Sequence, residues 1–360
     1  MRKRGTALAA FLLALGMAGI AAQDASAQGQ SLKGAGSTFV APVMARWIKH
    51  FAAVAPTQID YQAVGSGAGI EAIEAGKADF GATDKPLDPA ELAKYGLCQF
   101  PIVIGGIVPV VNLPGISPGQ IRFSGRVLAN IFMGKVTRWN DADIAGDNPY
   151  LSLPDLPITV IYRSDKSGTT YNWTSFLAQS NPDWKTRFGM VLLMNLPLGV
   201  SRAGNAGVSA AVQETEGSIG YVEYAYALQH LLTYGTVANA FRIFVQPGSD
   251  SFRLAASAVD WRRHPDFSVL MTNAPGPGAY PIAATTFILM PKAPKDTARS
   301  AAAIAFFKWA LESGGTDAAD LQYVSLPPDV VAQVEDYWNR QIKSAPVKAP
   351  LARKPVVRQR

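Results

Sequence analysis

The chain has 360 residues, of which 48% are hydrophobic and 17% charged, and its formal net charge is +6. The hydrophobic fraction excludes a wholly disordered chain, and the length predicts one large domain or two to three smaller ones. A single cysteine, Cys98, excludes a disulfide framework and a cysteine-built zinc site, and the three histidines lack the spacing of metal ligands. The positive charge is typical of proteins that bind polyanions such as nucleic acids, provided that it lies on the folded body.

The first 27 residues have the three parts of a secretory signal. Arg2, Lys3 and Arg4 form a basic start, residues 7–22 are apolar, and small residues ending at Ala27 suit a signal peptidase. We predict cleavage after Ala27 and export of the mature chain. The alternative is a membrane anchor, but the apolar run is shorter than the roughly 20 residues that a spanning helix needs. No cysteine lies near the cleavage site, so a lipid anchor is not expected.

Short strand patterns alternate with helix patterns along the mature chain. The first helix pattern places Phe39, Val43, Trp47 and Phe51 on one face, with Pro42 in its first turn. This alternation predicts an α/β protein built largely on parallel sheets. Helices are expected at residues 39–51, 70–77, 169–179, 296–312 and 329–342, and strands at residues 59–63, 78–82, 157–162, 218–227 and 280–290.

The last eighteen residues, 343–360, contain three prolines and six basic residues but no acidic residue. This composition predicts a disordered basic tail. The signal accounts for +2 and the tail for +6 of formal charge, so residues 28–342 carry −2. The excess positive charge therefore lies at the two ends of the chain. Residues 28–342 are not expected to bind nucleic acid.

In three places the chain runs from a strand through a loop of small residues into a helix, at residues 34–39, 64–70 and 164–170. The first turn of a helix has N–H groups without internal acceptors and carries partial positive charge. Glycines let a ligand approach the backbone, and serine and threonine hydroxyls add donors. Each loop therefore suits an anion. The alternative is that the loop hydroxyls only cap their helices, at Ser37, Thr38, Ser66 and Thr169.

Several enzyme sequence motifs are similar to segments of this chain, but each is incomplete or absent here. Both Gly-x-Gly pairs lack the third glycine of a dinucleotide fingerprint, and Gly76-Lys77 lacks the upstream glycine of a phosphate loop. No Gly-x-Ser-x-Gly elbow and no Ser-x-x-Lys motif occur, and no histidine lies near the three loops. Hydrolysis therefore remains only as the second hypothesis.

Four segments together resemble one family closely: residues 34–39, 61–69, 80–84 and 167–169. They are similar to the periplasmic phosphate-binding proteins of Pst-type ABC transporters, and residues 100–106, 204–207, 217–227 and 285–289 extend the similarity. The resemblance covers roughly residues 31–342. It implies a two-lobed periplasmic binding-protein fold of type II, α/β in class, with two chain crossings that act as a hinge. The lobes would comprise residues 28–105 with 272–342, and residues 106–271.

The same resemblance implies that one dehydrated phosphate lies between the lobes. Thr38, Phe39 and Ser66 would donate hydrogen bonds from the first lobe, Phe39 through its backbone N–H. Arg163 would donate from the second lobe, where its planar fork fits two oxygens of the ion. Without the resemblance, Arg163 would be interpreted as an ordinary surface ion pair. The remaining donors of the second lobe would be Ser167, Gly168 and Thr169.

Two acidic residues belong to the expected site. Asp165 would either orient Arg163 or hydrogen-bond to its own loop. Asp84 would either shape the turn before Pro86 or accept a hydrogen bond from phosphate, which at neutral pH still carries a proton. Sulfate has no such proton, and a like-charge contact costs several kcal/mol. We therefore expect Asp84 to accept phosphate and reject sulfate, whereas arsenate, which also carries a proton, would not be rejected in this way.

The resemblance implies a receptor rather than an enzyme. The protein would capture inorganic phosphate with high affinity in the periplasm and deliver it to the membrane subunits of an ABC-type permease. No cofactor, metal or nucleic acid is expected as a partner, and the chain would be a monomer. Closure would be a shift of population toward a form in which both lobes contact the ion.

Overall fold

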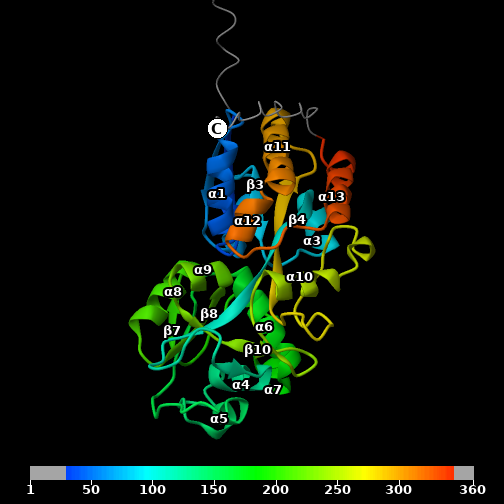
Figure 1. Ribbon diagram of the computed structural model, residues 1–360. Coiled ribbons are helices and arrows are strands. Elements are labelled where there is room, and N and C mark those ends of the chain that lie inside the picture. The colour runs from blue at the N-terminus through cyan, green and yellow to red at the C-terminus, as the bar shows by residue number, and fades with distance from the viewer. Residues whose placement is uncertain (1–29, 344–360) are drawn as a thin grey trace, which may run out of the picture.

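The computed structural model describes residues 30–343 (Figure 1). The predicted cleavage site after Ala27 and the tail from residue 344 onward lie outside the described residues. The first part of the chain forms β1 (Ser31–Gly36), α1 (Ala41–Phe51), β2 (Gln58–Gln62), α2 (Ser66–Glu74), β3 (Phe80–Thr83), α3 (Pro89–Tyr95), β4 (Leu97–Val111), β5 (Arg122–Phe123), α4 (Gly125–Phe132), α5 (Ala142–Asp147), β6 (Thr159–Arg163), α6 (Gly168–Ser180) and α7 (Pro182–Arg187). The second part forms β7 (Val200–Arg202), α8 (Gly204–Glu214), β8 (Ser218–Glu223), α9 (Tyr224–Gln229), β9 (Thr233–Tyr234), β10 (Thr236–Ala238), β11 (Phe244–Val245), α10 (Ser249–Ser257), a 3-10 helix (Trp261–Arg263), β12 (Ala283–Pro291), α11 (Thr297–Ser313), α12 (Gly315–Asp320) and α13 (Pro328–Gln341).

The main sheet has the strand order β2-β1-β3-β12-β4-β8-β6-β7. Strands β2 and β3 both pair in parallel with β1, and β7 and β8 both pair in parallel with β6. In contrast, β12 is antiparallel to β3 and β4, and β4 is antiparallel to β8. The expectation of largely parallel sheets is therefore wrong. The sheet is mixed because two central antiparallel strands join two parallel sets.

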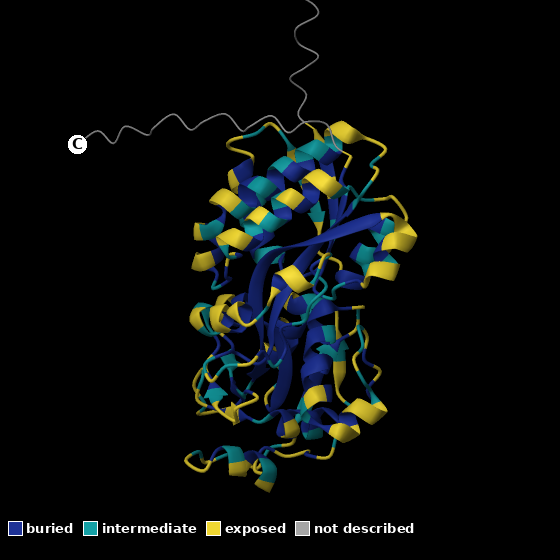
Figure 2. Cartoon of the chain, turned by 90° about the vertical axis from the view of Figure 1, so that its right-hand side faces the viewer, coloured by how far each residue is buried: buried dark blue, intermediate teal, exposed yellow. Residues whose placement is uncertain are grey.

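Two lobes lie one above the other in Figure 1. The upper, first lobe holds α1, β3, α3, α11, α12 and α13, and the lower, second lobe holds helices α4 to α9 with β7, β8 and β10. Strand β4 runs through both lobes, since residues 97–106 pair with β12 and residues 107–111 pair with β8. All of β4 is buried, and Figure 2 shows such buried strands inside a shell of partly exposed helices. The two-lobed α/β architecture expected from the sequence is confirmed.

Two elements differ most from those predicted. Helix α2 begins at Ser66 rather than at residue 70, and Gly65 before it has a φ of 95°, which favours glycine. Most of the second loop of small residues is therefore helix. The pattern of residues 218–227 predicts one strand, but β8 ends at Glu223 and α9 follows. The Glu223 carboxylate accepts a hydrogen bond from the Ala225 N–H at 2.8 Å, so it caps the helix that interrupts the expected strand.

Aromatic side chains fill the core of each lobe. In the first lobe, Phe100 packs edge-on against Trp338 with ring centroids 5.0 Å apart. In the second lobe, Trp173 stacks on Tyr221 at 4.8 Å. Cys98 is buried as predicted, and burial raises the pKa of its thiol to about 12, which keeps it unreactive. Among the helices of the described part, none combines the length and the apolar character that a bilayer crossing needs.

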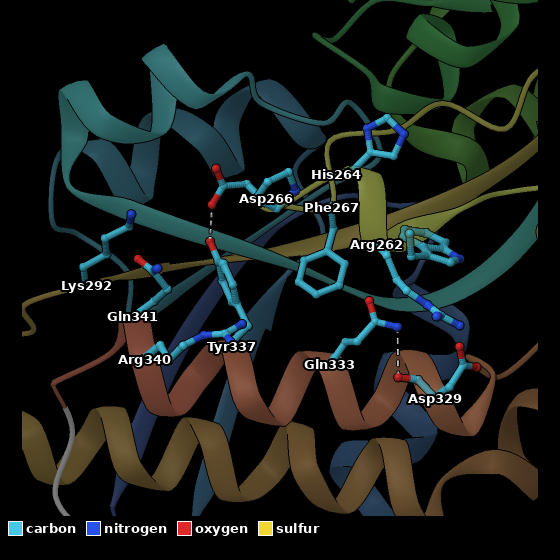
Figure 3. A pocket seen from close by; sticks show the side chains of 12 residues that line it. Arg262, His264, Asp266, Phe267, Lys292, Asp329, Gln333, Tyr337, Arg340 and Gln341 are labelled. Atoms are coloured by element: carbon cyan, nitrogen blue, oxygen red, sulfur yellow. Dashed lines mark hydrogen bonds between the residues drawn. The ribbon is translucent and has the colours of Figure 1, made fainter.

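One segment packs away from its predicted lobe. Residues 261–267 fall in the range expected for the second lobe, but Tyr337 of α13 donates a hydrogen bond to Asp266 at 2.6 Å. The rings of Phe267 and Tyr337 also lie 5.4 Å apart. The segment and α13 together enclose a hollow of about 720 Å³ (Figure 3). This packing buries Phe267 against the first lobe, and the exact lobe limits stay a prediction.

Gly106 lies where β4 passes between the lobes, and we predict that alanine there destabilises the fold. A Cβ would stand 2.1 Å from Cε1 of the buried Phe252 ring. Overpacking of this kind costs about 1–3 kcal/mol. Urea denaturation of Gly106→Ala should show this loss in the free energy of unfolding. The control is Gly146→Ala, whose Cβ would meet no atom within 4 Å, and equal stability of the two variants would contradict the prediction.

Candidate anion-binding site

Five segments from the two lobes meet around one buried polar cluster. The first lobe contributes the loop before α1, the start of α2 and the end of β3, and the second lobe contributes the turn from β6 into α6 and the start of α8. Asn172 of α6 donates to the main-chain oxygen of Asp84 at 2.8 Å, and a Cβ on Gly168 would stand 2.4 Å from Oγ of Ser66. All eight predicted contact residues are buried here: Thr38, Phe39, Ser66, Asp84, Arg163, Ser167, Gly168 and Thr169.

Arg163 ends β6 and is only 1% exposed, so it is no surface ion pair. Its Nε donates to Oδ1 of Asp165 at 2.7 Å, and its Nη2 donates to Oδ2. The Gly204 N–H also donates to Oδ1 of Asp165, at 3.0 Å. Burial raises the pKa of Asp165, but the hydrogen bonds and charge of Arg163 outweigh burial, so this pKa lies below its usual value. Asp165 therefore holds the guanidinium in place.

The guanidinium of Arg163 has more donors than the protein uses. Of its five N–H groups, Asp165 accepts two, and Oγ1 of Thr169 lies 3.4 Å from Nη1. The other two have no acceptor among residues 30–343. A buried cation with unpaired donors costs free energy unless an anion accepts them. Arg163 thus presents two unused N–H groups within the buried cluster.

Asn205, near the start of α8, directs two hydroxyl hydrogens. Its Nδ2 donates to Oγ1 of Thr38 at 2.8 Å and to Oγ1 of Thr169 at 3.3 Å, and its backbone N–H donates to Thr38 at 3.3 Å. Its Oδ1 accepts the Glu223 N–H at 3.0 Å, which fixes the amide this way round. A hydroxyl has two lone pairs and one hydrogen. Asn205 fills both lone pairs of Thr38, and Asn205 with Arg163 fills those of Thr169, so both hydroxyl hydrogens remain to be donated.

The first turn of α6 adds backbone donors to the cluster. Ser167 is the N-cap, and its Oγ accepts the Thr170 N–H at 3.1 Å. The N–H groups of Gly168 and Thr169 have no acceptor within residues 30–343. They carry the partial positive charge of the helix terminus, which favours an anion.

Two alternatives that the sequence left open fail here. The helices α1 and α2 have no side-chain cap, and α6 is capped by Ser167. None of the four hydroxyls named for this role, those of Ser37, Thr38, Ser66 and Thr169, therefore serves as a cap. The turn before Pro86 is held by Thr83, whose Oγ1 donates to the Lys85 carbonyl at 2.9 Å and accepts the Lys85 N–H at 3.1 Å. The Asp84 side chain is therefore free for another role.

Asp84 follows β3 and is 2% exposed. Its Oδ1 accepts hydrogen bonds from Oγ of Ser37 at 2.6 Å and from Oγ1 of Thr286 at 2.7 Å, and its N–H donates to Oγ of Ser66 at 3.2 Å. No residue between 30 and 343 donates to its Oδ2. Burial raises the pKa of Asp84 from 3.8 to about 6, although these hydroxyls and Arg163 lower it. One carboxylate oxygen is thus anchored and the other is left to accept.

We predict that Asp84→Asn stabilises the anion-free protein. An unfolded aspartate has a pKa near 3.9, whereas Asp84 in the fold titrates at about 6. Folding therefore favours the protonated form, and the ionised carboxylate lowers the free energy of unfolding as pH rises from about 4 to about 6. Asparagine carries no charge and still accepts from Ser37 and Thr286. Urea denaturation should show a gain of about 2–3 kcal/mol at pH 8 and about half of that at pH 5, and equal stability at pH 8 would refute the effect.

Glu223 is a second acid behind the cluster, and it is fully buried. The Tyr323 hydroxyl lies 2.6 Å from the Phe39 carbonyl oxygen and 2.8 Å from Oε2 of Glu223. That hydroxyl has one hydrogen, and the carbonyl can only accept. The hydroxyl therefore shares its one hydrogen between these two acceptors. Burial raises the pKa of Glu223 well above its usual value, which disfavours its charged form.

Comparison with known proteins now identifies the family. Residues 21–313 match the family described as the PBP superfamily domain. A phosphate-binding protein PstS of Xylella fastidiosa strain Temecula1 is 49% identical over 312 residues, which cover 87% of this chain and 86% of that relative. The chain belongs to the PstS family. The PstS protein of Haemophilus influenzae is 42% identical over 88% of this chain and 95% of its own length.

Solved structures show the same fold as this PstS family member. A periplasmic phosphate-binding protein, PfluDING, solved with bound phosphate, matches with a TM-score of 0.69 at 21% sequence identity. The match covers 89% of this chain and 100% of that chain. At this identity the likeness concerns the fold, and it agrees with the two lobes described above.

Some positioning residues of this polar cluster were not predicted. Ser37 and Thr286 both hold Asp84, and Asn205 directs Thr38. Thr286 reaches Asp84 because β12 pairs with β3, with Phe287 opposite Thr83. The signal available in the sequence was weak: Ser37, Asn205 and Thr286 lie in segments that resemble the family, but nothing in their spacing joins them.

Proposed function

We propose that this PstS family member captures one inorganic phosphate ion with high affinity and delivers it to the membrane subunits of an ABC-type phosphate permease. The observation that carries the proposal is one buried cluster that contains both a cation with unused donors, Arg163, and a carboxylate with an unused oxygen, Asp84. An anion is needed to satisfy Arg163, and that anion needs its own proton to meet Asp84. Phosphate has both properties, and relatives at 49% and 42% identity are named for binding it.

The hydroxyl and N–H hydrogens that remain without an acceptor support a donor role for the predicted contacts other than Asp84. Thr38 and Thr169 keep hydroxyl hydrogens that Asn205 leaves free. Ser66 and Ser167 each accept a backbone N–H at Oγ, so their hydrogens are also available. The N–H groups of Gly168 and Thr169 lack acceptors among residues 30–343, and the Phe39 N–H, now 3.0 Å from Oγ of Ser37, would turn to the ion.

The two lobes would close on the ion about a hinge at the middle of β4. There β4 changes partner between Gly106 and Ile107, and the Ile107 N–H donates to the Ile282 carbonyl at 3.0 Å just before β12. The sequence places the two hinge crossings at the limits of lobes of residues 28–105 plus 272–342 and residues 106–271. Since residues 261–267 pack against the first lobe, the second crossing would precede residue 261. Contacts available only when both lobes meet the ion would drive closure.

The setting of this activity is the periplasm. The sequence supports a signal that is cleaved after Ala27, without a lipid anchor. The protein would work as a monomer without metal or cofactor. It acts as a binding protein and not as an enzyme, like the PstS relatives.

Equilibrium dialysis of the chain from residue 28 against labelled phosphate tests the proposal. One phosphate should be retained per chain, and unlabelled sulfate should not displace it. The same preparation should release no product from a chromogenic phosphate ester. Steady release of product would indicate a phosphatase, and salt-sensitive retention of an oligonucleotide without phosphate retention would indicate a nucleic-acid binder.

A further inference from the structure

Three tyrosine hydroxyls hold three successive carbonyls of the loop before α1. Tyr61 donates to the Ser37 carbonyl at 2.7 Å, Tyr226 donates to the Thr38 carbonyl at 2.8 Å, and Tyr323 donates to the Phe39 carbonyl at 2.6 Å. We call these the three tyrosine contacts. Tyr323 also donates to Oε2 of Glu223, at 2.8 Å.

These contacts fix the directions of the neighbouring N–H groups. No peptide bond in residues 30–343 is cis, and in a trans peptide the C=O and the N–H point to opposite sides. Tying the carbonyl of Thr38 to a tyrosine therefore turns the N–H of Phe39 away from that tyrosine. A hydrogen bond at the carbonyl also polarises the peptide and strengthens its N–H as a donor. With the Thr38 carbonyl held in this way, the Phe39 N–H points toward the polar cluster, where it donates to Oγ of Ser37 at 3.0 Å beside Asp84.

Tyr226 differs from the other two because it comes from the opposite lobe. Tyr61 lies on β2 and Tyr323 follows α12, so both belong to the first lobe together with the loop. Tyr226 lies on α9 in the second lobe, and it is 8% exposed. Next to this contact, Asn205 of the same lobe binds the Thr38 side chain. Residue 38 is therefore held at its carbonyl and at its hydroxyl by the second lobe.

We propose that Tyr226 is a positioning residue for phosphate capture. When the lobes meet, its hydroxyl orients and polarises the Thr38–Phe39 peptide so that the Phe39 N–H faces the ion. This inference rests on the proposed function, since the ion is phosphate. Closure of the lobes and orientation of the Phe39 N–H then occur together, because the peptide that contacts the ion is oriented by the lobe that closes over it. Tyr226 acts through the peptide and does not itself touch phosphate.

Tyr226→Phe tests the proposal, because it removes the hydroxyl and keeps the ring. The Thr38 carbonyl then loses its strong donor and keeps, among residues 30–343, only the Ala41 N–H at 3.4 Å. We expect the Kd for phosphate to rise about tenfold, mostly through faster dissociation in stopped-flow tryptophan fluorescence. The shift of the Phe39 backbone ¹⁵N resonance on adding phosphate should also shrink. Tyr226→Met serves as the second variant if the phenylalanine variant does not fold.

Tyr224→Phe is the matched control on the same helix. Its hydroxyl lies 3.2 Å from the Tyr234 hydroxyl, within the second lobe, and makes no contact with the loop before α1. Its Kd and the Phe39 shift should stay within about twofold of wild type. An unchanged Kd in Tyr226→Phe, or a raised Kd with an unchanged Phe39 shift, would overturn the positioning role. Failure of the wild-type chain to bind phosphate would instead overturn the proposed function.

Discussion

Asp84→Asn is expected to bind sulfate at least about a hundredfold more tightly than the wild-type chain does. In the wild type, Oδ2 of Asp84 has no donor among residues 30–343 and would face the ion under the proposed function, where a like-charge contact costs several kcal/mol. Each factor of ten in affinity corresponds to about 1.4 kcal/mol. Asparagine removes the charge and offers an N–H to a sulfate oxygen. Phosphate should bind more weakly, because its hydrogen loses a charged acceptor.

Isothermal titration calorimetry at pH 8 with sulfate and phosphate measures both effects. Asp60→Asn is the control, because Asp60 is an exposed residue of β2 in the same lobe and loses the same charge. That variant should exclude sulfate as the wild type does. If Asp84→Asn kept wild-type phosphate affinity and still bound no sulfate, selection by this carboxylate would be wrong.

The same carboxyl should make sulfate exclusion depend on pH in the wild-type chain. Its pKa is raised to about 6, so at pH 8 it is ionised and at pH 5 it is mostly protonated. The protonated form no longer repels sulfate and donates a hydrogen bond to it. Competition between sulfate and labelled phosphate should therefore increase as pH falls below about 6 in the wild type and should be nearly independent of pH in Asp84→Asn.

Arg163→Met is the substitution expected to weaken phosphate binding most. Removing one member of a buried, hydrogen-bonded charge pair costs about 2–5 kcal/mol, which predicts a rise in Kd of about 30-fold to several thousandfold. Arg163→Lys keeps the charge but loses the planar fork and its bonds to Asp165, so its Kd should lie between those of the wild type and Arg163→Met. Calorimetry with phosphate measures the three affinities.

A double variant separates binding from folding. Arg163→Met leaves Asp165 without its partner, so this variant should also lose stability in urea. Arg163→Met combined with Asp165→Asn removes the orphaned charge and should recover much of that stability without recovering phosphate affinity. Phosphate binding by the double variant at wild-type strength would show that Arg163 does not contact the ion.

Local patterns in the sequence predicted ten of the helices and strands, but the long central strand β4 and helix α8 were not among them. The apolar spacing around Trp47, Trp309 and Trp338 predicts three helices, and these tryptophan side chains are buried on α1, α11 and α13. Such spacing can be recognised because it depends on one element alone. The mixed sheet was not predictable in this way, since strand pairing joins distant segments. The end of β8 at Glu223 was also not predicted, because its carboxylate caps a helix inside an apolar run.

For the site, small-residue loops pointed to an anion, and the resemblance assigned the residues. The structure brings all eight into one buried cluster, and it adds partners that no local pattern reveals. Thr286 holds Asp84 across 202 residues of sequence, and Tyr226 reaches the Thr38 carbonyl across 188. Such contacts depend on how β12 enters the sheet and how α9 meets the first lobe, and tertiary structure alone sets both.

A crystal structure of the chain from residue 28 with phosphate tests the central claim most directly, because it locates the ion. One phosphate should lie between the lobes, with its oxygens within about 3.2 Å of the Arg163 guanidinium and of the Gly168 and Thr169 N–H groups. One further oxygen should lie about 2.5–2.8 Å from Oδ2 of Asp84, as expected for a hydrogen bond from a protonated oxygen. Phosphate bound instead in the hollow beside α13, among Arg262, Lys292 and Arg340, with none between the lobes, would contradict the claim.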